Sequence, residues 1–241
     1  MVSLCAHLAA RAAASVKPLG LLALTAVVVG GFAATPGAAE TNTVLDSWLG
    51  AQAGVRTMSA DFVQIRTLKT LVQPLVAQGH LWFALPNQFR WELGRPAQTI
   101  ALRHQDDIFV VYPRLKRAEH YPLGSQAPRA WRDAMALLDV GFPRTRQEFE
   151  AQFRVLSQCQ TNGTWLLVLQ PRSAAARQFM PEMRVSLATN DFSLVATELV
   201  FMDGSRMRNE FSHLVANEPM DESLFKWTAP GDFVVTEPFA K

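Results

Sequence analysis

Apolar and polar residues alternate along most of the chain. In the stretch QFRWEL, Phe89, Trp91 and Leu93 alternate with Arg90 and Glu92. This period of two predicts a half-buried strand with the apolar side chains inside and the charged ones facing solvent. Other short segments are rich in aromatic and β-branched residues and are separated by Gly, Pro or Asp. The segments with this character are SADFVQIRTL, GHLWFAL, QFRWEL, TIALRH, DIFVVY, FRVLSQC, TWLLVLQP, EMRVSLAT, LVATELVFM and RMRNEFSHL.

These segments predict a mainly β protein built on one antiparallel sheet of nine or ten strands. Asn162-Gly163 and Asp203-Gly204 stand between consecutive segments, where two-residue hairpin turns need a positive φ. A sheet of this size has to protect its edges, and full or partial closure into a barrel does so. We therefore predict an incomplete antiparallel β-barrel.

Three stretches have helical rather than strand periodicity. Residues 42–53, NTVLDSWLGAQA, place their large apolar residues at helical intervals, and residues 127–140, APRAWRDAMALLDV, do the same. A further helical stretch, residues 144–153, follows a Gly-Phe-Pro break. We expect these helices to cover the concave side of the sheet as a lid over an apolar cavity.

The N-terminal region has the order of features found in secretory signal peptides. Arg11 and Lys17 precede an uncharged apolar run over residues 19–34, and the small residues of TPGAAE follow. We predict that residues 1–39 are a signal peptide cleaved after Ala39, and that residues 40–241 form one domain in the periplasm. An uncleaved membrane anchor is the alternative, although the run is shorter than the roughly 20 residues that span a bilayer.

Composition narrows the classes of function. Removing Arg11 and Lys17 from the 23 basic residues leaves a number equal to the 21 acidic residues. Without a basic excess, nucleic-acid binding is not expected. Cys159 would be the only cysteine of the processed chain, so an internal disulfide and a CxxC site are excluded, and we expect this thiol to be buried.

Motifs for catalysis are missing from the sequence. It contains no HExxH and no GxSxG, and it has no phosphate-binding GxxxxGK[ST] loop. His104 lies near Asp106 and Asp107, but a solvated turn explains that grouping better than a metal site does. We expect no enzymatic activity, no cofactor and no metal.

Several motifs, in order along the chain, resemble those of the periplasmic lipoprotein carrier family LolA. They are ADFVQ, GHLWFALPNQFRWEL, FVVYPRLKRAEHYPL, WLLVLQP, a DGS hairpin and NEPMDESLFKWTAPGDFVV. The family's F-x-Q falls on Phe62 and Gln64. The residues that match its two longer motifs are Gly79, Leu81, Pro86, Phe89 and Trp91 in the first, and Asn217, Met220, Asp221, Phe225, Trp227, Pro230 and Gly231 in the second.

The resemblance implies an incomplete antiparallel barrel with a helical lid and a non-enzymatic carrier of acylated lipoproteins. Exposing an acyl chain to water costs about 0.8 kcal/mol per methylene, so such a carrier needs an apolar cavity. The implied partners are the acylated cargo, an ATP-driven exporter at the inner membrane and an acceptor at the outer membrane, and we expect a monomer.

The expected cavity combines inward-facing strand residues with lid residues. They are Phe62, Leu81, Phe83, Leu85, Phe89, Trp91, Ile100, Leu102, Ile108, Val110, Trp131, Met135 and Leu138. Leu85 departs from the family, in which an arginine often precedes the proline and hydrogen-bonds to the lid. Two alternatives stay open: a carrier of another lipid or acylated product, such as a polyene lipid for a dedicated export pathway, and a periplasmic regulator that senses lipoproteins.

Overall fold

The computed structural model describes residues 38–123 and 145–238 of the chain, with side chains from Val44 onward. The predicted signal segment up to residue 37 lies outside the described residues. So does the predicted helix over residues 127–140, which carries Trp131, Met135 and Leu138. The positions of these residues therefore stay predictions.

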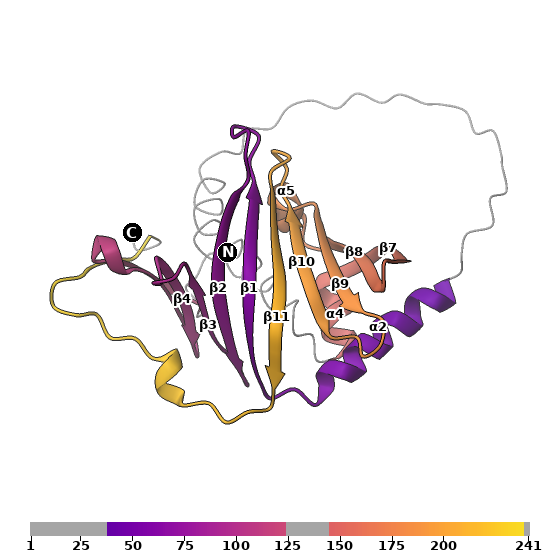
Figure 1. Ribbon diagram of the computed structural model, residues 1–241, viewed down its shortest axis with the longest axis horizontal. Helices are drawn as coiled ribbons and strands as arrows, with labels where there is room; N and C mark the ends of the chain where they lie inside the picture. Colours follow the sequence, from indigo (N-terminus) through magenta and orange to yellow (C-terminus); the bar gives the residue numbers. More distant parts are fainter. Residues whose placement is uncertain (1–37, 124–144, 239–241) are drawn as a thin grey trace.

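One twelve-stranded sheet forms the body of the described protein (Figure 1). Its strands are β1 (Thr57–Thr67), β2 (Leu75–Ala84), β3 (Gln88–Leu93), β4 (Thr99–His104), β5 (Asp107–Tyr112), β6 (Arg117–Pro122), β7 (Phe153–Thr161), β8 (Thr164–Pro171), β9 (Glu182–Ala188), β10 (Leu194–Val200), β11 (Arg206–Ala216) and β12 (Val234–Thr236). Their order across the sheet is β12-β6-β5-β4-β3-β2-β1-β11-β10-β9-β8-β7. The sheet is open, with β12 and β7 at its two edges, and this confirms the mainly β, incompletely closed fold.

Pairing between neighbouring strands is antiparallel except where β12 runs parallel to β6. The hairpin between β7 and β8 turns at Asn162 and Gly163, with φ of 49° and 75°, as the Asn-Gly signal predicts. The structure has twelve strands where nine or ten were expected, and the two that the sequence did not predict are β6 and β12. The segment of β6 mixes charged residues into its pattern and ends in proline, and β12 has only three residues.

Five short helical elements accompany the sheet in the described ranges. They are α2 (Ala38–Ala53), α4 (Arg146–Gln152), α5 (Ala174–Phe179) and the 3₁₀ helices η1 (Pro113–Leu115) and η3 (Glu222–Phe225). The helix predicted over residues 42–53 begins four residues earlier, at Ala38. Thr145 caps α4, because its side chain accepts a hydrogen bond from the backbone N–H of Glu148.

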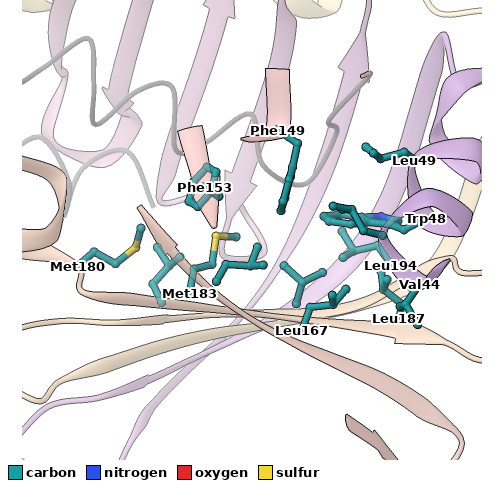
Figure 2. Packing of buried hydrophobic residues seen from close by; sticks show 14 of the residues in the cluster. Val44, Trp48, Leu49, Phe149, Phe153, Leu167, Met180, Met183, Leu187 and Leu194 are labelled. Carbon is teal, nitrogen blue, oxygen red and sulfur yellow. The ribbon is translucent and has the colours of Figure 1, made fainter. Parts of the chain in front are cut away.

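The main core lies between two of these helices and the β7–β10 part of the sheet (Figure 2). Trp48 of α2 is fully buried and meets Phe149 of α4 edge to face, with ring centroids 6.0 Å apart. Leu167, Met183 and other strand residues complete the cluster. The helical periodicity of the first predicted helix is thereby explained, since its apolar side faces this core.

We call the side of the sheet that α2 and α4 cover the inner face, and the opposite side the outer face. Met207 of β11 belongs to the main core, and Phe211, four residues along the same strand, lies on the same side. Phe211 pairs with Phe62 of β1, and directly paired residues share a face. The inner face therefore continues without interruption from the main core onto β1, β2 and β3.

The residues after β11 cover part of the outer face. They run from the end of β11 past β3 and β4 to β12, as the yellow segment of Figure 1 shows. Trp227 and Phe233 pack there against a cluster that contains Leu102 and Val111. We refer to residues 217–238 as the C-terminal segment.

Candidate functional site

A second apolar cluster occupies the inner face over β1, β2 and β3. Its buried members are Met58, Phe62 and Leu81, and its partly buried members are Val55, Phe83, Trp91, Leu93, Phe211 and Leu214. We call this group the aromatic cluster. None of these residues comes from α2 or α4. This cluster therefore differs from the main core, in which helix residues cover the strands.

Strand register brings the aromatic residues of the cluster together. Leu81 pairs with Trp91 across β2 and β3, and Phe83 pairs with Phe89. The rings of Phe62 and Trp91 lie 4.0 Å apart between centroids, and Phe211 meets Trp91 nearly perpendicularly at 6.3 Å. These contacts make a broad aromatic surface that stays partly open at Phe83, Phe89, Trp91 and Phe211.

Gly79 makes the contact between Phe62 and Trp91 possible. It stands between Phe62 of β1 and Leu93 of β3 in the register. A Cβ at this position would overlap both the ring of Phe62 and the backbone oxygen of Glu92. The glycine of the motif therefore leaves room for the Phe62 ring to lie across β2.

A buried polar ladder crosses the same face next to the aromatic cluster. The side-chain amide of Gln64 donates to Oδ1 of Asn209 at 3.0 Å, and Asn209 Nδ2 donates to the hydroxyl of Thr197 at 3.3 Å. All three side chains are buried, and buried polar groups need such partners. The glutamine of the F-x-Q motif thus joins β1, β11 and β10.

The structure brings together most of the strand residues predicted to line the cavity. Phe62, Leu81, Phe83 and Trp91 belong to the aromatic cluster, and Phe89 lies on the same face through its pairing with Phe83. Two more of the predicted residues, Ile108 and Val110, lie further along this face on β5 and are fully buried.

Ile100 and Leu102 do not belong to this surface, and their expected place in the cavity is wrong. Trp91 pairs with Ala101, which puts both neighbours of Ala101 on the outer face. There they pack with Trp227 of the C-terminal segment. These apolar residues of β4 belong to the outer-face cluster that contains Leu102 and Val111. The sequence pattern of β4 alone does not show which of its residues face which side.

Arg90 and Glu92 were expected to face solvent, and this expectation is also wrong. The two side chains are only 19% and 25% exposed and form an ion pair of 2.6 Å. Arg90 also donates to the backbone oxygen of Leu224 at 3.1 Å. The pair lies beneath η3 because the C-terminal segment crosses the outer face of β3.

Leu85 lies just beyond the end of β2. Its backbone N–H donates to the oxygen of Arg56 at 2.9 Å, and its side chain is half-buried. It is not a member of the aromatic cluster. Leu85 thus stands at the edge of the candidate site.

Two parts of the inner face escaped prediction. Phe211 and Leu214 come from β11, where Met207, Asn209 and Phe211 alternate with polar residues, so a period of two was there to find. Glu119 of β6 is buried on the same face as Val110.

Glu119 has two side-chain partners on its own strand. The hydroxyl of Tyr121 donates to it at 2.7 Å and Arg117 donates at 2.9 Å. Burial, together with this carboxylate, raises the pKa of Tyr121 above its ordinary value. These residues were missed because β6 itself was not predicted.

A polar cluster on the outer face gathers residues that are distant in sequence. Asp61 accepts hydrogen bonds from His80 at 2.9 Å, from Arg95 at 2.6 Å and from His213 at 3.1 Å. The His80 hydrogen bond, aided by His213 and the nearby cations, lowers the pKa of Asp61 against the opposing effect of burial. Within the described residues, no group of three or more His, Cys, Asp and Glu side chains is arranged to hold a metal ion.

Two further findings bear on the sequence expectations. Cys159 is exposed on β7, so the expected burial of this thiol is wrong.

None of the described helices has the length and apolar character that crossing a membrane requires.

In the described parts of the chain, the fold and the site form an open antiparallel sheet with an aromatic cluster on its inner face. Residues 53–228 match the family model described as outer membrane lipoprotein carrier protein LolA. Because this match spans more than half of the chain, the protein belongs to the LolA family, as its motifs predict.

Several solved structures match parts of this chain. A putative outer membrane lipoprotein-sorting protein domain from Vibrio parahaemolyticus is 12% identical, with a TM-score of 0.44 over 76% of this chain and 94% of that one. A LolA superfamily protein from Nitrosomonas europaea is 7% identical, with a TM-score of 0.42 over 77% and 97%. A chain of the MucA/MucB complex of Pseudomonas aeruginosa is 13% identical, with a TM-score of 0.42 over 79% of this chain and 62% of that one. A search of curated proteins found no significant match.

Proposed function

We propose that this protein is a periplasmic carrier that binds the acyl chains of lipoproteins on its inner face and moves them from the inner to the outer membrane. The observation that carries the proposal is the partly open aromatic cluster over β1, β2 and β3. Membership of a family described as outer membrane lipoprotein carriers supports it.

The chemistry of the inner face suits an acyl chain. Phe83, Phe89, Trp91 and Phe211 offer partly exposed rings, while the polar side chains of the ladder already have partners. Such a surface gains free energy by covering methylene groups, at about 25 cal/mol per Å² of apolar area removed from water. It makes few directional demands on the cargo, so chains of different proteins can use it.

Release needs partners in this proposal. The sequence has no phosphate loop with which to use ATP, so the carrier depends on an ATP-driven exporter for loading and on an outer-membrane acceptor for unloading. Residues 1–39 direct export in this scheme and are then removed.

The test is extraction of bound lipid. The protein is purified from the periplasm of a Gram-negative host without detergent, and its organic extract and co-purified proteins are identified by mass spectrometry. We expect acylated lipoprotein in stoichiometric amounts. Phe89→Glu is expected to lower that amount by about tenfold or more, because a carboxylate replaces apolar contact area.

Leu115→Glu is the matched control, because Leu115 is an apolar residue on η1 that is 72% exposed. It adds the same charge and should leave the bound lipid unchanged. Circular dichroism shows whether each variant is folded. Wild-type protein without acylated cargo contradicts the carrier proposal, and an unfolded Phe89→Glu variant assigns Phe89 to the core. A different co-purified lipid supports the alternative carrier, whereas a bound signalling protein supports the regulator.

A further inference from the structure

The hairpin between β1 and β2 ends in exposed aliphatic side chains. Leu71, Val72, Leu75 and Val76 are 43%, 97%, 48% and 62% exposed. Four of the exposed large hydrophobic residues in the described ranges thus fall within six consecutive positions. Single exposed hydrophobic residues are ordinary on protein surfaces, but a group of this kind marks an interaction site.

A second hairpin extends the apolar tip. Met202, in the turn between β10 and β11, is 63% exposed. Lys69 of the first hairpin reaches this turn, since its Cε lies 2.6 Å from where a Cβ on Gly204 would stand. Figure 1 shows both hairpins projecting from the same end of the sheet. We call these five apolar residues, Leu71, Val72, Leu75, Val76 and Met202, the apolar tip.

The base of the apolar tip has an excess of positive charge. Lys69 and Arg206 are both exposed there. Arg66 pairs with Leu75 in the register of β1 and β2, next to Thr67, which pairs with Arg206. The acidic residue of the two turns is Asp203, whose carboxylate accepts hydrogen bonds from the backbone and side chain of Ser205. Cations next to protruding aliphatic groups fit an anionic lipid surface, where headgroups meet the cations and acyl chains meet the side chains.

We propose that the apolar tip inserts shallowly into an anionic phospholipid bilayer. The apex of this narrow projecting tip carries aliphatic side chains and, at Thr70 and Gln73, uncharged polar ones. This composition suits shallow insertion between lipids, and the polar backbone groups of the turn limit its depth. The inference rests on the proposed function and deepens it, because a carrier that loads and unloads acyl chains at membranes gains a way to dock.

The first experiment measures which part of the protein meets lipid. An environment-sensitive fluorophore is attached at Val72→Cys, in a chain whose native thiols are removed by Cys5→Ser and Cys159→Ser. A matched chain carries it at Leu115→Cys, on another exposed apolar residue, which is 72% exposed against 97% for Val72. With vesicles of phosphatidylethanolamine and phosphatidylglycerol, we expect a blue shift and a rise in intensity at position 72 and no change at position 115.

The second experiment measures vesicle partitioning by co-sedimentation. Val72→Asp should weaken binding by about tenfold or more, because it places a charge where the side chain enters lipid. Leu115→Asp should stay within about twofold of wild type. Lys69→Glu should weaken binding to anionic vesicles, with little effect on purely zwitterionic ones. The variants share the rest of the chain, so other membrane contacts cancel in the comparison.

Three outcomes overturn the inference. These are equal fluorophore responses at positions 72 and 115, unchanged partitioning of Val72→Asp, and a tip that alters only self-association or the binding of another protein. Val72→Asp should also retain its extractable acylated cargo. If the wild-type protein docks on vesicles but yields no acylated cargo, the proposed carrier function is contradicted and the inference about the apolar tip stands.

Discussion

Phe62 shows at the scale of single residues how the F-x-Q motif and the first longer motif depend on each other. Its ring lies across β2 and reaches Trp91 of β3, because Gly79 has no side chain in the way. Phe62 belongs to the F-x-Q motif, whereas Gly79 and Trp91 belong to the first of the two longer motifs. The spacing of the motifs therefore reflects one three-strand contact.

Replacing that glycine tests the contact. Gly79→Ala should lower the free energy of unfolding by about 1–3 kcal/mol, the usual cost of forcing extra volume into a packed site. Chemical denaturation monitored by circular dichroism measures the change. Gly50→Ala is the control, since no atom lies within 4 Å of where its Cβ would stand, and alanine favours the helix there. Equal stability of the Gly79→Ala variant and wild type would contradict the described packing.

The sequence predicts single residues well where one strand decides the outcome. The alternation in QFRWEL correctly separates Phe89 and Trp91 from Arg90 and Glu92. It does not tell which face Ile100 and Leu102 occupy, because the pairing of Ala101 with Trp91 decides that. Nor does it reveal that η3 covers Arg90, since this contact joins positions far apart in the chain.

The C-terminal segment is the element that the motifs describe most closely. Asn217 accepts a hydrogen bond from the backbone of Arg56 at 2.8 Å, and Asp221 caps η3 through the N–H of Ser223. Phe225 is fully buried. These motif residues fasten the segment to the outer face, so their role is structural and distinct from that of the aromatic cluster.

His120 joins the end of this segment to the sheet. Its ring is bonded to Asp107 of β5 at 2.7 Å and to Glu237, just beyond β12, at 3.0 Å, and it stacks on Phe109. Burial disfavours the charged ring, but the hydrogen bonds to the two carboxylates outweigh burial and raise the pKa of His120 above its ordinary value. When it is protonated, the ring holds the end of β12 against β6 through these two carboxylates.

Attachment of β12 should consequently depend on pH. A raised pKa in the folded state means that the stabilisation is complete below the unfolded pKa of about 6.5 and is lost as pH rises through the folded value. Hydrogen exchange of the Val234 amide, which bonds to Lys116, should be better protected at low pH after correction for intrinsic rates. His120→Gln should remove this dependence. A pH-independent protection in wild type would contradict the role of His120 in attaching β12.

Some elements could not have been predicted from local pattern. β6 carries Glu119 and His120 within a short segment. The partners of Glu119 lie on the same strand, but those of His120 are distant in sequence and only the folded chain supplies them. β12 has three residues and exists because β6 offers an edge. The helix that includes Trp48, by contrast, follows from apolar spacing alone.

The whole molecule divides its inner face into two unequal parts. Over β7–β10, α2 and α4 cover the strands and complete a well-packed core. Over β1–β3, the cluster has three buried members and six partly buried ones. Among the described residues, one half of the open sheet is thus filled and the other half is incompletely covered. We propose that this arrangement suits the inner face to holding an apolar guest.

Fluorescence quenching of Trp91 tests this claim most directly. A diacylated lipopeptide with bromine on its acyl chains quenches tryptophans that its chains contact. Quenching is measured in wild type, in Trp91→Phe and in Trp227→Phe, since Trp227 lies partly buried on the outer face. We predict that Trp91→Phe removes a large share of the quenching and that Trp227→Phe leaves it unchanged. Absence of quenching in wild type, or equal losses in the two variants, would contradict the account.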